Sequence, residues 1–186
     1  LWKESTDKAI TGEILVEETV VASNIIAISY IANFLAKKYN SDTVIYSKRM
    51  RLLLPRSIRK IYESFSSRFI FYSNKQVIDD AEVLFHEVYP KLKTKTDVEN
   101  LSVGGVPIGD LIYDTYLRHN LLPTIDLTSK QFKLALMDGL NLYLYWKSYF
   151  EKKSVSAVIV SHCVYSWNAI ILRVAVHQLI PVYQVT

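Results

Sequence analysis

Short apolar segments alternate along this chain with stretches whose apolar residues recur at helical spacing. Two of these segments, residues 42–47 and 155–161, are rich in β-branched residues and carry no charge in their middle. A strand loses the usual alternation of polar and apolar residues when both of its faces are buried, as in a parallel sheet. The pattern therefore predicts an α/β fold, a Rossmann-like parallel sheet with helices on both faces.

The apolar spacing and the turn residues also predict where the elements lie. The expected strands are residues 13–18, 42–47, 68–72, 155–161 and 181–185. The expected helices are residues 24–38, 56–64, 75–89, 128–152, 166–179 and one that starts near Pro107, which suits the first turn of a helix. Ser23 or Asn24 is the expected cap of the first helix, and Thr128 opens a sequence that resembles a capping box. Residues 91–100 are polar without periodicity and are expected to form a loop. We expect residues 1–12 to be an N-terminal extension and residues 13–186 to form one Rossmann-like domain.

Composition narrows the classes of protein to which this chain can belong. Of the 186 residues, 50% are apolar and 22% are charged, as in an ordinary folded protein. Cys163 is the single cysteine, so neither an intramolecular disulfide nor a cysteine metal cluster is expected, and a reducing, cytoplasmic setting fits best. The four histidines have no metal-ligand spacing, and the chain lacks the glycine motifs of dinucleotide-binding and P-loop proteins. We therefore expect no metal and no cofactor.

The net charge of +4 comes largely from six cations between Lys48 and Lys60, which are interleaved with leucine and isoleucine. Such a segment suits anionic lipid headgroups or phosphate, although a solvated helix end explains it equally well. No nucleic-acid motif accompanies it, so nucleic acid is not an expected partner. Residues 19–36 and 154–172 lack acidic and basic side chains, but polar residues interrupt both stretches and argue against a membrane span. Peripheral contact with an anionic membrane surface through the segment between Lys48 and Lys60 is one expectation.

One segment combines a double glycine with a polar helical stripe. Gly104 and Gly105 precede an expected helix on which Asp110, Asp114 and Arg118 follow each other at intervals of four residues. Two aspartates at this spacing repel each other, so packing alone gives no reason for the pair. Arg118 is expected to pair with Asp114, and the amides after the glycines could hold a phosphate or carboxylate. The alternative is a solvated helix face with one ion pair.

Ligands of open parallel sheets collect beyond the carboxyl ends of the strands. The polar residues at the expected strand ends include Glu17, Glu18, Ser47, Ser161, His162 and Tyr165. His162 lies between a buried strand and a helix start, where a neutral imidazole can act as a base, although a structural role is the more common one. Glu17 and Glu18 point to opposite faces of their strand, so at most one of them faces a given cleft, and we favour Glu18.

Three segments, residues 13–17 with the following helix, residues 105–118 and residues 158–165, resemble the N-terminal half of bacterial surface-polysaccharide glycosyltransferases. The resemblance is to the capsule biosynthesis group with two Rossmann domains, known as the GT-B type. In such enzymes the N-terminal domain binds the glycan acceptor and a second Rossmann domain binds the nucleotide-sugar donor. The resemblance therefore implies that a donor-binding domain follows Thr186, and the lack of an initial Met also suggests an excised piece. The isolated chain is expected to be inactive.

The resemblance implies transfer of a sugar from an activated nucleotide to a hydroxyl of a growing glycan. The expected base is Asp110 first, then His162 and Glu18. The residues expected to bind substrate are Gly104, Gly105, Asp114, Arg118, Ser161 and Tyr165. Two alternatives stay open: another sugar-nucleotide enzyme on the same scaffold, such as a phosphotransferase or epimerase, and a non-catalytic, flavodoxin-like binding module.

Overall fold

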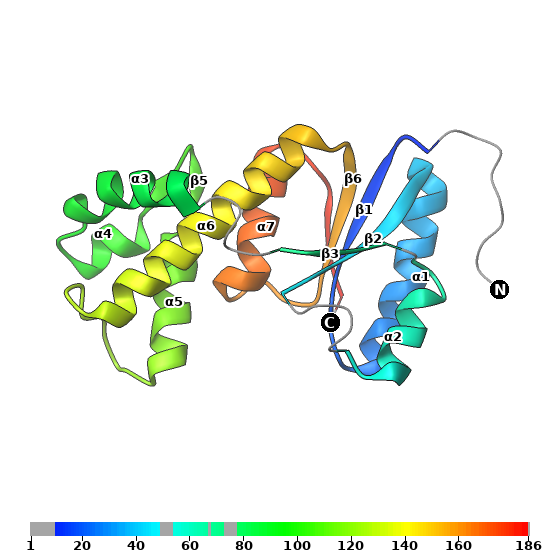
Figure 1. The fold of residues 1–186 in the computed structure, drawn as a ribbon, viewed down its shortest axis with the longest axis horizontal. Coiled ribbons are helices and arrows are strands. Elements are labelled where there is room, and N and C mark those ends of the chain that lie inside the picture. Colours follow the sequence, from blue (N-terminus) through cyan, green and yellow to red (C-terminus); the bar gives the residue numbers. More distant parts are fainter. Residues whose placement is uncertain (1–9, 49–53, 67, 73–77, 186) are drawn as a thin grey trace. The chain divides into compact units, whose positions relative to one another are not determined.

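The computed structural model describes residues 10–48, 54–66, 68–72 and 78–185 and confirms the α/β prediction (Figure 1). The chain divides into two compact units. The first, here called the sheet unit, comprises residues 1–73, 150–162 and 179–186. The second, the helical unit, comprises residues 74–149 and 163–178.

The sheet unit contains a five-stranded sheet in the order β3-β2-β1-β6-β7, and every neighbouring pair is parallel. Its strands are β1 (Gly12–Glu17), β2 (Ser41–Ser47), β3 (Arg68–Phe71), β6 (Val155–Val160) and β7 (Val182–Gln184). The register places Leu15 beside Val44 on one side and Val158 on the other. All three side chains are buried, which is why these strands read as continuous apolar runs.

The strand order reverses at the centre of the sheet. From β1 the chain builds outward through β2 to β3, and then returns to the other side of β1 to form β6 and β7. The carboxyl ends of β1 and β6 therefore flank a topological switch point, where open α/β sheets bind their ligands.

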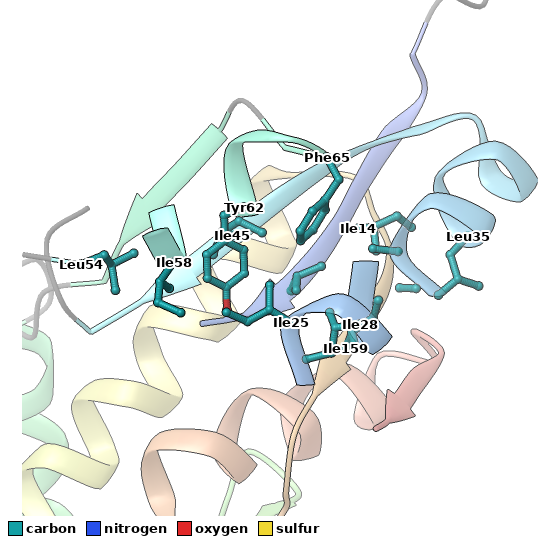
Figure 2. Packing of buried hydrophobic residues seen from close by; sticks show 13 residues of the cluster. Ile14, Ile25, Ile28, Leu35, Ile45, Leu54, Ile58, Tyr62, Phe65 and Ile159 are labelled. Atoms are coloured by element: carbon teal, nitrogen blue, oxygen red, sulfur yellow. The ribbon is translucent and has the colours of Figure 1, made fainter. Parts of the chain in front are cut away.

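Two helices, α1 (Ala22–Tyr39) and α2 (Arg56–Glu63), pack with the sheet in one apolar core. Figure 2 shows Ile25, Ile28 and Leu35 of α1 in this core together with Ile45 of β2 and Ile159 of β6. Because side chains at intervals of three and four residues share one face of a helix, a single stripe of α1 fills the core.

The start of α1 differs from the prediction that Ser23 or Asn24 caps it. The helix begins at Ala22, and its N-terminal flanking residue, Val21, provides no side-chain cap. Instead, the Tyr62 hydroxyl accepts a hydrogen bond from the Thr19 N–H at 2.7 Å and lies 3.0 Å from the Thr19 carbonyl oxygen, to which it donates. A buried phenol therefore fixes the entry into α1, which begins before the polar residues that looked like caps.

The helical unit is built from short elements and parts of longer helices. In chain order they are α3 (Ile78–Val88), a 3-10 turn η3 (Tyr89–Lys91), α4 (Lys95–Glu99), β4 (Ser102–Val103), β5 (Val106–Pro107), α5 (Gly109–Asn120), α6 (Lys130–Lys152, up to residue 149) and α7 (Ser166–His177).

Three local predictions in this unit are wrong. Residues 91–100 are not all loop, because Thr94 and Asp97 form a reciprocal capping box that starts α4. Pro107 does not open a helix but lies in β5, and α5 begins at Gly109. At the start of α6, Ser129 rather than Thr128 accepts the capping hydrogen bond, from the Phe132 N–H at 3.1 Å.

None of the described helices has both the length and the apolar composition needed to cross a membrane. This finding agrees with the interpretation of residues 19–36 and 154–172.

The core assignment of α1 can be tested on one helix. Ile28→Ala removes a fully buried side chain and should lower the free energy of unfolding by about 2–5 kcal/mol. Ile26→Ala is the matched control, because Ile26 lies on the same helix and is exposed; its effect should stay within about 0.5 kcal/mol. Urea unfolding followed by circular dichroism measures both, and equal losses would contradict the assignment.

Candidate functional site

Side-chain hydrogen bonds join the carboxyl ends of β1 and β6 at the switch point. Ser161, the first residue after β6, donates its backbone N–H to Glu17 Oε2 at 2.6 Å and its hydroxyl to the same oxygen at 2.9 Å. Glu17 is the last residue of β1 and is only 7% exposed. A buried carboxylate is tolerated when hydrogen-bond donors replace the lost water. Both of the donors described here belong to Ser161, at the end of the neighbouring strand.

His162 extends this network by one residue. Its Nδ1 lies 2.8 Å from Ser161 Oγ. A serine hydroxyl has a single proton, and here that proton points to the Glu17 carboxylate, which can only accept. The short contact therefore requires that His162 Nδ1–H donates to Ser161 Oγ. In the neutral ring the lone pair is then carried by Nε2.

We call Glu17, Ser161 and His162 the relay, because its hydrogen bonds run in one direction from imidazole to carboxylate. Such an arrangement fixes the tautomer and orientation of the ring and leaves Nε2 as its proton-accepting nitrogen. These are the properties of a general base. Among the described residues of the sheet unit, His162 is the only imidazole.

Glu18 lies on the other side of the same strand end. Its backbone N–H donates to the Tyr46 carbonyl at 3.0 Å, and its Oε2 accepts from the Ser47 hydroxyl at 3.2 Å. Its other oxygen, Oε1, is enclosed and has no hydrogen-bond donor within the described part of the chain. Glu17 thus turns toward β6 and Glu18 toward β2, and Glu18 keeps one acceptor oxygen that a ligand hydroxyl could satisfy.

The two tyrosines near this edge, Tyr46 and Tyr62, are poor candidates for a base. Burial raises the pKa of the Tyr46 phenol well above its usual value, and the nearby Glu17 carboxylate raises it further. Burial likewise raises the pKa of Tyr62, although its hydrogen bond with Thr19 opposes the change. Both phenols therefore stay protonated at neutral pH.

In the helical unit, Asp110 is engaged in an ion pair. Arg173 Nη2 lies 2.7 Å from Asp110 Oδ2, and Nη1 lies 3.4 Å from Oδ1 and 3.2 Å from the Pro107 carbonyl oxygen. This two-pronged contact joins the start of α5 to α7. A carboxylate that a guanidinium holds in this way is a poor choice for a general base, although Asp110 was the residue expected first.

The predicted pairing of Asp114 with Arg118 is not observed: no ion pair joins them in the described structure, and both residues are exposed. Partial desolvation raises the pKa of the Asp114 carboxyl, and the charges of Asp110 and Glu99 add to the increase. The repulsion between the two aspartates that their spacing predicts is therefore present, and Arg118 does not relieve it.

Gly104 and Gly105 form the tight turn of the β4-β5 hairpin, at φ +56° and +82°. A side chain at Gly104 would collide with the Tyr143 hydroxyl. The glycines are separated from α5 by β5, and the N–H groups of Ile108 and Gly109 each donate to the Leu101 carbonyl at 3.0 Å. The positive φ angles of the turn and the close approach of the Tyr143 hydroxyl explain these glycines. The backbone amides that were expected to hold a phosphate or carboxylate do not lead directly from the glycines into the helix.

Tyr165 belongs to an aromatic stack. Its ring lies 4.8 Å from that of Trp167 at an interplanar angle of 21°, and the Trp167 ring lies 5.1 Å from that of His119 at 4°. Next to the stack, the buried Ser166 hydroxyl lies 3.0 Å from Thr115 Oγ1 and 3.1 Å from the Leu111 carbonyl, which fixes the start of α7 against α5. Spacing gave no sign of this stack, because its members come from two helices.

The predicted site residues fall into two groups, each described within its own unit. Glu18, Ser161 and His162 lie in the sheet unit, and Gly104, Gly105, Asp110, Asp114, Arg118 and Tyr165 lie in the helical unit. Ser161 and His162 of the first group are joined to Glu17, the neighbour of the predicted Glu18. In the basic segment between Lys48 and Lys60, residues 49–53 lie outside the described residues.

Two further features bear on ligands. No group of three or more potential metal ligands occurs in the ranges that the structure describes. The helical unit also has an open hollow of about 580 Å³ between the end of α5 and the start of α6, which contains none of the predicted site residues. It is lined by Tyr116, Asn120, Leu122, Pro123, Thr124, Ile125, Asp126, Ser129 and Gln131.

Comparison with protein-family models, curated proteins and solved structures finds no match to this chain.

The tight hairpin gives a direct test of local geometry. Gly104→Ala should lower the free energy of unfolding by about 1–3 kcal/mol, because the position has a positive φ and faces the Tyr143 hydroxyl. Adding Tyr143→Phe should restore part of the loss by removing that hydroxyl. Urea unfolding of the single and double variants measures both effects, and a fully stable Gly104→Ala variant would contradict the turn geometry.

Proposed function

We propose that this chain is the acceptor-binding half of a glycosyltransferase. The enzyme transfers a sugar from a nucleotide-sugar donor to a hydroxyl of a growing surface polysaccharide or lipid-linked glycan. The observation that supports this proposal most is the relay at the switch point, because transfer to a hydroxyl requires a base at the place where an α/β sheet binds its ligand. The resemblance of the three segments supplies the class of substrate.

In the proposed reaction, His162 Nε2 removes the proton of the acceptor hydroxyl as the oxygen attacks the anomeric carbon of the donor sugar. A carbon–oxygen bond forms there, and the bond to the nucleotide phosphate breaks. The nucleotide, a nucleoside diphosphate or in a CMP-sugar the monophosphate, leaves with the electron pair of that bond. Ser161 and Glu17 hold the ring and compensate for its new positive charge.

Glu18 is the proposed positioning residue for the acceptor. Its enclosed Oε1 lacks a donor among the described residues, and a second hydroxyl of the glycan would provide one. The two groups take different things from a ligand: His162 Nε2 takes a hydroxyl proton, and Glu18 Oε1 accepts a hydrogen bond.

His162 replaces Asp110 as our first candidate for the base, because Arg173 holds the Asp110 carboxylate. Asp114, Arg118 and Tyr165 stay predictions as acceptor contacts. The donor is expected to bind a second Rossmann domain beyond Thr186.

The proposed place of action is the cytoplasmic side of an inner membrane, where lipid-linked glycans are extended. The cations between Lys48 and Lys60 support this proposal through their attraction to anionic headgroups. Of those within the described residues, Arg56 and Lys60 are exposed on α2.

Turnover by the full-length native polypeptide tests the proposal. A panel of UDP-, GDP-, dTDP- and CMP-sugars is supplied with a membrane extract as the source of acceptor, and nucleotide release and sugar incorporation are measured. His162→Ala should lower turnover at least about 100-fold, because the proton of the acceptor loses its base. If Asp110 were the base, Asp110→Asn would instead cause the loss of ~100-fold.

His86→Ala is the matched control, because His86 is an exposed imidazole on α3 in the helical unit; it should retain the wild-type rate. Circular dichroism verifies that each variant folds. A wild-type rate for a folded His162→Ala variant would remove His162 as the base. Absence of turnover with every donor would contradict the proposed function itself and favour a binding module.

A further inference from the structure

Helix α1 carries apolar side chains on two of its faces. Ile25, Ile28, Ala32 and Leu35 are buried in the core of the sheet unit. On the outward face, three large apolar residues follow each other at intervals of four. Ile26 is 49% exposed, Tyr30 57% and Phe34 66%. A helix that is apolar on both faces is ordinarily covered on both, so the outward stripe indicates a surface that the helix lies against.

The charges on α1 are of one sign. The helix contains no acidic residue, and its only charged residues are Lys37 and Lys38 in the last turn. Both are exposed and follow Phe34 by three and four residues, so they continue the apolar stripe on the same face. The outward face of α1 is therefore an apolar strip that ends in two cations.

Helix α2 adds to this charge. It packs in the same core as α1 and exposes Arg56 and Lys60. Its one acidic residue, Glu63, has its Oε1 3.7 Å from Nε of Arg59. We call the outward stripe of α1, with Lys37 and Lys38, the α1 face; the exposed cations of α2 add to the positive charge of the same unit.

We infer that the α1 face lies on an anionic lipid surface. An interfacial helix buries aromatic and aliphatic side chains at the boundary between headgroups and acyl chains, while its lysines and arginines meet the phosphates. Ile26, Tyr30 and Phe34 supply the first part and the cations the second. No described helix is suited to cross a bilayer, so the helix lies along the surface.

A second copy of the chain fits this face less well. A second copy would cover the apolar stripe, but it would bring the same cations and no acidic residue from α1 to compensate for them. Anionic lipid satisfies the apolar stripe and the cations together. The inference deepens the membrane location in the proposed function and rests on it only for its biological setting, since lipid binding requires no catalysis.

Vesicle co-sedimentation of the full chain tests the inference. One set of vesicles contains phosphatidylcholine alone. The other also contains phosphatidylglycerol at a molar fraction of about one third, which makes its surface anionic. The wild type should bind the anionic vesicles. The triple variant Ile26→Ser, Tyr30→Ser, Phe34→Ser should bind them at least about tenfold more weakly, because it removes the apolar stripe. The double variant Lys37→Glu, Lys38→Glu should also weaken binding to the anionic vesicles, and this loss should be larger at low salt than at high salt.

Val83→Ser is the matched control: Val83 is 61% exposed on α3 in the helical unit, and the variant should bind like the wild type. Fluorescence gives an independent readout. Acrylodan is attached to the cysteine of the variant Tyr30→Cys, Cys163→Ser, and its emission should shift to the blue on anionic vesicles because the dye enters an apolar environment.

Three results would overturn the inference. One is a wild type that stays in the supernatant with anionic vesicles. Another is a folded triple variant that binds like the wild type, which would place the contact elsewhere, such as the segment between Lys48 and Lys60. The third is a dimer in light scattering that the triple variant abolishes while vesicle binding is unchanged, which would assign the stripe to a second copy. None of these results depends on His162, so failure here is distinguishable from failure of the proposed reaction.

Discussion

The buried carboxylate of Glu17 is the constraint on which the candidate site depends. It ends the central strand β1 and is almost fully removed from water, so it requires donors from the protein. Two of its donors are the backbone N–H and the hydroxyl of Ser161. Because the hydroxyl proton is used in this way, the next contact, to His162, can run in only one direction. The need to compensate one buried charge thereby fixes the tautomer of the imidazole.

This constraint also explains why the site lies where the strand order reverses. Residues at the ends of β1 and β6 are neighbours only because the two strands pair in parallel at the centre of the sheet. Glu18, one residue further along, turns to Ser47 on β2. The end of β1 therefore presents one carboxylate to each neighbouring strand. Glu17 faces β6 and is joined to His162 through Ser161, and Glu18 faces β2 and retains one acceptor oxygen.

The fold was largely predictable because burial on two faces leaves a clear pattern in sequence. The apolar runs at β2 and β6 and the helical spacing in α1 require only local information, and their approximate bounds agree with the structure. Local start signals were less reliable. Pro107 looked like a first-turn proline but lies in a hairpin strand, because the preceding glycines turn the chain back on itself.

The candidate site was predictable only in part, because its contacts join residues that are far apart in the chain. Ser161 and His162 were expected from their place after a buried strand. Glu17 was passed over in favour of Glu18, since sequence does not show which of two adjacent carboxylates faces β6. Asp114 was assigned to Arg118 by helical spacing, whereas the ion pair that forms joins Asp110 to Arg173, 63 residues away. Tertiary pairing of this kind leaves no periodic signal.

The tautomer of His162 is the measurement closest to the central claim. Two-bond proton–nitrogen correlation spectra at a pH where the ring is neutral distinguish a proton on Nδ1 from one on Nε2. The relay predicts that wild-type His162 carries its proton on Nδ1, and that Ser161→Ala, which removes the acceptor, shifts the population toward Nε2–H. A wild-type ring protonated on Nε2, or a tautomer that Ser161→Ala leaves unchanged, would contradict the relay and with it the assignment of His162 as the base.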